Sequence, residues 1–156
     1  MAILPEKGGI AVFMNDDTIK LLRECNSGIK MGVSSLEEVI GHVKDAGLKN
    51  ILEKSKSEHE NLGNETHRYL TEYNDDGKDP ASVAKLMSWL KTNVKLSVDN
   101  SDEVVADLIA DGCAMGVKSL YKYLHQYPAA EEKVKELTKK IIKEESDMLH
   151  DMYEYL

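Results

Sequence analysis

The chain has 156 residues, of which 42% are hydrophobic and 31% charged, a composition typical of a folded globular domain. Its 28 acidic and 20 basic residues give a net charge of −8 at pH 7, which argues against nucleic acid or an anionic membrane as the main partner, because both would repel it. Two cysteines do not make a disulfide framework, which favours a reducing, cytoplasmic location.

Residues 1–14 differ from the rest of the chain and form a predicted N-terminal arm. Pro5 and the two glycines that follow it interrupt the apolar stretch, unlike the continuous apolar core of a signal peptide. No segment approaches the roughly 18 apolar residues of a membrane span. Residues 10–14, IAVFM, are predicted as a short strand or as an arm laid on a neighbouring subunit, and a frayed terminus is equally compatible.

From residue 15 onward the sequence predicts one helical domain, residues 15–156. After the capping residues 15–17, apolar side chains spaced alternately by three and four predict a helix of about 28 residues. Asp45-Ala46-Gly47 ends this helix, and a second helix is predicted from about Leu48 to Tyr73. Together the two helices form a predicted hairpin, residues 15–74.

A crossover, residues 75–100, follows this hairpin. A polar loop ending at Pro80 stops the second helix, and a shorter helix is predicted over residues 81–98. A helix of 18 residues spans about 27 Å, enough with its extended ends to cross the length of the bundle. The second hairpin, residues 101–156, is then expected to begin at the same end as the first and to be related to it by a pseudo-twofold axis.

An internal repeat relates the two hairpins. Residues 28–36, GIKMGVSSL, match residues 112–120, GCAMGVKSL, at an offset of 84 with six of nine positions identical. The partner helices align at an offset of 86. Two hairpins joined by one long connection predict an all-α four-helix bundle, with a simple five-helix array as the alternative.

The segments LLRECN (21–26), MSWLKT (87–92), DGCAMGVKSL (111–120) and the closing Tyr155-Leu156 carry a family resemblance. With the repeat and the crossover, the span from residue 15 to 156 resembles the ferritin-like superfamily, and within it a group of short, uncharacterised bacterial proteins. The resemblance implies a ferritin-like four-helix bundle of two repeated hairpins with a helical crossover. It implies little about chemistry.

The metal ligands of di-iron ferritin-like proteins are not repeated in this sequence. Those proteins use two Glu-x-x-His pairs, and this chain has none. Asp147-Met148-Leu149-His150 has the spacing, but the helical pattern places Asp147 and His150 toward the outside. We therefore do not expect a conventional di-iron oxidase or ferroxidase, and the sequence favours a protein that is not an enzyme.

Four glycines lie inside predicted helices, as Gly28-x-x-x-Gly32 and Gly112-x-x-x-Gly116. Each costs about 1 kcal/mol relative to alanine within a helix, so each needs a reason. The favoured interpretation is that the two helices touch directly across the pseudo-twofold axis. The alternative is that the glycines make room for a bound molecule.

Polar residues at inward-facing positions form the candidate site. His59 and Glu145 occupy repeat-equivalent inward positions near the middle of the bundle, and a buried ion needs a partner, so we expect them to pair. Glu58 and Glu144 lie beside them, and Asn26 and Thr66 satisfy polar groups about two helical turns away. The pair either fixes helix register or, with Glu58 or Glu144, forms a site for a small ligand or for iron or zinc.

Two functions follow from these features. The first is a non-catalytic structural or protein-interaction module without a cofactor, acting as a homodimer or with a protein partner through the crossover helix (Met87, Trp89, Leu90) and the N-terminal arm. The second is a metal- or small-ligand-binding protein with a reduced site around His59 and Glu145. Cys25 and Cys113 are expected to be buried thiols.

Overall fold

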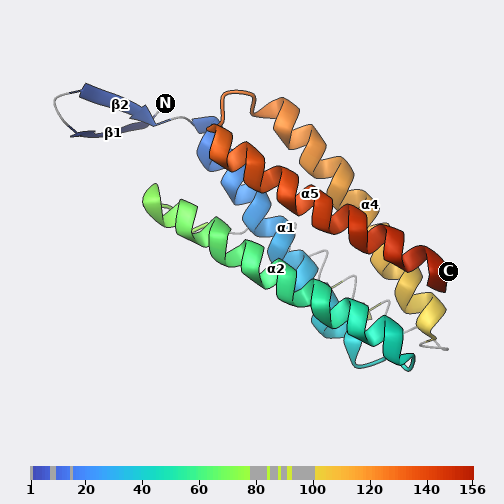
Figure 1. Ribbon diagram of the computed structural model, residues 1–156. Coiled ribbons are helices and arrows are strands. Elements are labelled where there is room, and N and C mark those ends of the chain that lie inside the picture. The colour runs from blue at the N-terminus through green and yellow to red at the C-terminus, as the bar shows by residue number, and fades with distance from the viewer. Residues whose placement is uncertain are drawn as a thin grey trace.

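The computed structural model describes residues 2–7, 10–14, 16–77, 84, 88, 91, 92 and 101–156. Within these residues, four long helices pack as a bundle: α1 (Asp16–Ile40), α2 (Ala46–Glu72), α4 (Asp102–Gln126) and α5 (Glu132–Met152), the last followed by the 3₁₀ turn η1 (Tyr153–Tyr155) (Figure 1). The predicted four-helix bundle is therefore confirmed for the helical part of the chain.

The N-terminal arm forms a β-hairpin. Strand β1 (Ala2–Lys7) pairs antiparallel with β2 (Ile10–Met14), so the strand predicted over residues 10–14 is confirmed, whereas β1 was not anticipated. The register is irregular between Leu4 and Lys7, where Pro5 has no N–H to donate to the partner strand.

The helices begin where polar side chains cap them. Asp45, predicted to end the first helix, is the N-cap of α2, and its carboxylate accepts a hydrogen bond from the Leu48 N–H at 2.8 Å. Ser101 caps α4 in the same way, accepting from the Val104 N–H at 3.3 Å. Such caps satisfy N–H groups that have no partner within the helix.

Hydrogen bonds between the hairpins show which ends meet. The Asp102 carboxylate, at the start of α4, accepts the backbone N–H groups of Lys44 and Asp45, both at 2.8 Å. At the other end of the bundle, the Thr18 hydroxyl at the start of α1 accepts the N–H of Glu131 at 2.9 Å. Each hairpin therefore turns beside the first residues of the other.

This arrangement corrects one expectation about the topology. The second hairpin does not begin at the same end as the first, because α2 ends where α1 begins and a connection that crosses the bundle must deliver the chain to the opposite end (Figure 1). Helix α4 consequently runs antiparallel to α1. The two interhairpin contacts are also repeat-equivalent, since Thr18 and Asp102 are 84 residues apart and Asp45 and Glu131 are 86 apart.

The core divides into two apolar clusters along the bundle axis. One lies toward the start of α1 and includes Leu22, Leu70 and Leu137, and the other lies toward its end and includes Leu36, Leu52 and Met152. Each cluster draws on all four helices, so apolar burial holds the bundle together at both ends. A polar layer occupies the level between them.

Most of the predicted crossover helix, including Met87, Trp89 and Leu90, lies outside the described residues. The four residues described there, Ala84, Ser88, Lys91 and Thr92, are helical and exposed. Within the described part of the chain, no helix has the length and apolar character needed to cross a membrane.

Candidate functional site

The polar layer between the two apolar clusters is built around His59 of α2 and Glu145 of α5. The His59 Nε2 atom lies 2.8 Å from Glu145 Oε1, which confirms that these two residues pair. His59 is 0% exposed and Glu145 is 8% exposed, so the bond is largely removed from water. A charged or neutral hydrogen bond at this depth is expensive to break, because neither partner has water to replace the other.

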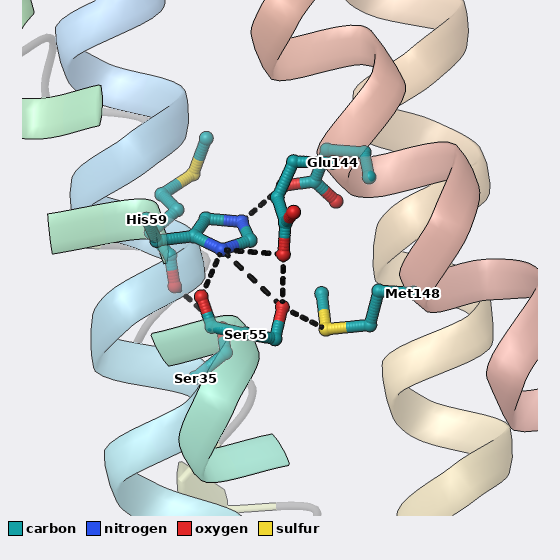
Figure 2. Close-up of polar contacts among 7 residues, drawn as sticks. Ser35, Ser55, His59, Glu144 and Met148 are labelled. Carbon is teal, nitrogen blue, oxygen red and sulfur yellow. Dashed lines mark hydrogen bonds and ion pairs between the residues drawn. The ribbon is translucent and has the colours of Figure 1, made fainter. Parts of the chain in front are cut away.

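The second ring nitrogen of His59 faces its own helix. Figure 2 shows His59 between Ser55 and Glu144. The Nδ1–H donates to the Ser55 carbonyl oxygen at 2.8 Å, and since a carbonyl only accepts, Nδ1 carries a proton. The Ser55 hydroxyl donates to Glu144 Oε1 at 2.8 Å and lies 3.0 Å from the Met148 sulfur. The Ser55 hydroxyl also lies 3.5 Å from His59 Nδ1, so polar contacts link Glu145, His59, Ser55 and Glu144.

The network holds a proton on or beside the imidazole. Burial is the largest single influence on His59 and by itself lowers its pKa, but the hydrogen bond and charge of Glu145, the Ser55 carbonyl and the charge of Glu144 together outweigh it, so that the pKa of His59 is raised. Because Nδ1 is already protonated, this second proton lies in the Nε2–Oε1 bond. The pair therefore carries one proton more than a free neutral histidine beside a free carboxylate.

This raised pKa predicts how stability depends on pH. Because folded His59 binds its proton more tightly than unfolded histidine (pKa about 6.5), its contribution is complete below about pH 6.5 and is lost as the pH rises through the folded pKa. We expect urea midpoints to fall between about pH 6 and pH 8 by more in the native protein than in His59→Gln. Equal slopes in the two proteins would contradict this assignment.

Glycine packing explains how a full imidazole fits at this level. A Cβ atom on Gly32 of α1 would lie 2.8 Å from His59 Cδ2, so only glycine admits the ring. A Cβ on Gly116 of α4 would lie 3.5 Å from Glu145 Oε2, an ordinary contact. At Gly28 and Gly112 a Cβ would meet no described atom within 4 Å.

The glycines also border a cavity of about 510 Å³ between α1 and α4. Its walls come from residues 24–36 and 108–123, its floor from residues 141–148 of α5, and all four glycines line it. The favoured interpretation, in which the glycines bring α1 and α4 into direct contact, is therefore wrong, because Gly32 and Gly116 receive the side chains of α2 and α5 and the remaining space stays open. The alternative, that the glycines make room, fits this arrangement.

Several residues of this site carried no recognised signal in the sequence. Ser55 lies on the same inward face of its helix as His59, but its bridge from His59 to Glu144 depends on α5 lying opposite. The Cys113 thiol lies against Glu145, and burial first, then the Glu145 charge, raise its pKa well above the usual range, so the thiol stays protonated. The Ser27 hydroxyl is buried with no hydrogen-bond partner among the described residues.

The remaining candidate residues lie away from the pair. Glu58 is exposed and lines a separate cleft between α2 and α5, together with Asp147 and His150, which are exposed as expected. Asn26 is buried and donates to the Gly77 carbonyl at 3.0 Å, and the Thr66 hydroxyl donates to the Leu62 carbonyl, so both satisfy their own surroundings.

Among the described residues, no three His, Cys, Asp or Glu side chains are grouped so that they could hold a metal ion. The proposed ligands His59 and Glu145 instead bond to each other, and Glu144 reaches them through Ser55. An arrangement of this kind can hold and exchange a proton between two buried groups, and it presents one carboxyl group to the cavity.

Comparison of the chain with protein-family models, curated proteins and solved structures finds no match in any of the three. The argument for function therefore rests on the geometry of the site.

Proposed function

We propose that the protein is a non-catalytic binding protein that holds a small, largely apolar molecule in the cavity between α1 and α4. The cavity, about 510 Å³, carries this proposal, since small-molecule sites typically occupy about 300–1,000 Å³. Its lining is mostly apolar and includes Met31, Met115, Leu120 and Ile141. Gly28 and Gly112 border it where a Cβ would meet no described atom within 4 Å, and a functional opening between two helices would explain their cost in helix stability.

A few polar groups converge on this apolar space. Glu145 lies at its floor, Cys113 lines its α4 wall and Ser27 lines its α1 wall. An apolar body with a small number of fixed polar groups is the usual composition of a ligand site, because apolar contact supplies affinity and polar groups fix orientation. The Cys113 thiol lies against Glu145, but burial and the charge of Glu145 raise its pKa and hold it in the unreactive protonated form. These features support binding rather than catalysis.

A neutral aromatic probe tests the proposal. We expect naphthylmethanol to bind the native protein at one site, as measured by isothermal titration calorimetry. Gly112 lines the cavity, and a Cβ there meets no described atom within 4 Å, so a leucine side chain has room to occupy part of the cavity and should weaken binding by about tenfold or more. Leucine is also a better helix former than glycine, so this variant should remain folded.

Gly41→Leu is the matched control. A Cβ on Gly41 likewise meets no described atom within 4 Å, but this glycine does not line the cavity, so binding should equal that of the native protein. Absence of probe binding to the native protein, or equal binding to all three proteins, would overturn the proposal.

Exposed apolar side chains favour a second candidate, the structural or interaction module. Met115 and Tyr121 of α4 are 59% and 50% exposed. Large apolar side chains with this much exposure on one helix are typical of a surface that contacts another molecule. They would suit contact with a second copy of the chain or with another protein. The ferritin-like relationship, the cytoplasmic location and an iron or zinc ion at the His59–Glu145 pair also stand as proposals.

A further inference from the structure

The charged residues that line the α1/α4 cavity are all acidic. Glu24, Asp111 and Glu145 contribute carboxyl groups, and no lysine, arginine or histidine is among the described lining residues. In a chain with a net charge of −8, this one-sided lining attracts positive charge and repels anions. The effect is strongest at Glu145, because the field of a carboxylate is least screened where little water reaches it.

The carboxyl group of Glu145 also has capacity for a further partner. Its Oε1 atom bonds to His59, while Oε2 faces the cavity wall beside Gly116, whose missing side chain leaves the approach open. The Cys113 thiol, a weak donor, also contacts this carboxyl group. A carboxylate accepts up to about four hydrogen bonds, so a donor group on a molecule in the cavity could bond to an oxygen lone pair of Glu145 that is otherwise unused.

The surrounding side chains suit a cation with an apolar body. Met31, Met115, Met148 and Tyr123 line the same space. Thioethers are polarizable and fit irregular shapes, and aromatic faces attract organic cations. The Ser27 hydroxyl, without a partner among the described residues, adds a hydrogen-bonding position on the α1 wall.

We infer that the cavity binds organic cations, each an apolar body carrying one ammonium group that donates to the Glu145 carboxyl. This inference rests on the proposed function and adds the chemical class of the ligand. It also requires a change in protonation. The His59–Glu145 pair with its extra proton is neutral overall, so adding an ammonium would leave a buried positive charge unless that proton departs.

The protein provides a route for this proton. Ser55 and Glu144 line the separate cleft between α2 and α5, and the Ser55 hydroxyl lies 3.5 Å from His59 Nδ1 and donates to Glu144 Oε1 at 2.8 Å. When the Nδ1 proton moves to the Ser55 hydroxyl oxygen, that hydroxyl gives its own proton to Glu144, which is 21% exposed and can release it to water on the opposite side from the ligand. The remaining imidazole proton then stays on Nε2 and is donated to Glu145. The titratable groups that face the pair are Glu144 of α5 and Cys113 of α4, while α1 contributes only Gly32 there.

Three probes that share one ring system test the ligand class. At pH 6 we expect naphthylmethylammonium to bind about tenfold or more tightly than naphthylmethanol, and naphthoate to bind more weakly than either. Titration in two buffers with different ionisation enthalpies should show release of about one proton with the ammonium probe and none with the alcohol.

Variants locate the effect. Glu145→Gln keeps a hydrogen-bonding group opposite His59 but removes the charge, so within this variant the ammonium probe should bind no more tightly than the alcohol. Glu58→Gln makes the same change in the other cleft and should keep the preference.

The outcomes separate the two proposals. If the alcohol binds but the ammonium binds no more tightly, or if Glu145→Gln retains the preference, the inference about cations is overturned while the proposed function stands. If none of the three probes binds the native protein, the proposed function itself fails. Ammonium binding without proton release would overturn the protonation change.

Discussion

Replacing Glu145 by alanine is expected to lower the free energy of unfolding by about 3–5 kcal/mol, the usual cost of removing one partner from a buried ion pair. His59 is fully buried, and its Nε2 atom has Glu145 as its hydrogen-bond partner at 2.8 Å. Without that carboxyl group, the imidazole must either keep an unpaired charge or lose its proton and leave a nitrogen unsatisfied. Both alternatives are costly in a site that water barely reaches.

The same substitution should reverse the pH dependence of stability. In the native protein, Glu145 contributes most to raising the pKa of His59. Without Glu145, the effect of burial dominates, and burial lowers the pKa of His59. The unfolded chain then binds the proton more tightly than the folded one. Glu145→Ala should therefore lose stability as the pH falls below about 6.5, whereas the native protein loses it as the pH rises above that value.

Urea unfolding at several pH values measures both effects. Glu144→Ala is the matched control, because it removes the neighbouring carboxylate, which is 21% exposed and contacts His59 only at 3.9 Å. We expect this control to cost about 1 kcal/mol or less. A Glu145→Ala variant that is no less stable than Glu144→Ala, or that keeps the native pH slope, would show that the pair does not hold the proton as described.

Gly32→Ala should lower the free energy of unfolding by about 1–2 kcal/mol, although alanine is the better helix former. The new methyl group would lie 2.8 Å from His59 Cδ2, closer than carbon atoms approach. His59 cannot move aside cheaply, because hydrogen bonds to the Ser55 carbonyl and Glu145 hold both of its ring nitrogens. Either α1 must shift or the His59 ring must break one of its two hydrogen bonds. The free-energy cost of either change exceeds the gain in helix propensity from alanine.

The other glycines of the repeat provide the comparison. Gly28→Ala and Gly112→Ala place a methyl group where no described atom lies within 4 Å, so each should raise the free energy of unfolding by about 0.5–1 kcal/mol. Thermal or urea unfolding of the three variants side by side measures the contrast. If all three substitutions are stabilising, the close packing of His59 on Gly32 is not as described.

The helical architecture was largely predictable from local signals. Apolar periodicity and capping residues placed α1 and α2 within a few residues of their observed ends. Asp45 shows the limit of such signals. It was predicted to end the first helix but is the N-cap of the second, because aspartate is typical both of the end of one helix and of the start of the next. The direction of the second hairpin was mispredicted, because periodicity carries no information about which bundle end a helix starts from.

The pairing of His59 with Glu145 was also predictable, because both residues lie at inward positions of repeat-equivalent helices and a buried ion demands a partner. The role of the glycines was not. A small residue on a helix face is compatible with direct helix contact, with a pocket, or with space for a large side chain from a third helix. Gly32 serves the third purpose, which depends on α2 placing an imidazole against α1.

By itself the sequence determined which residues are helical, which helix faces are apolar and which polar groups had to be buried together, because these properties depend on the spacing of side chains within one helix. The tertiary structure alone decided that α1 and α4 leave a cavity between them and that Ser55 links His59 to Glu144. It also decided that Glu145 faces the cavity while Glu58 faces the opposite cleft. Those features depend on how four helices are rotated and spaced against one another, and the close fit of buried side chains fixes that geometry.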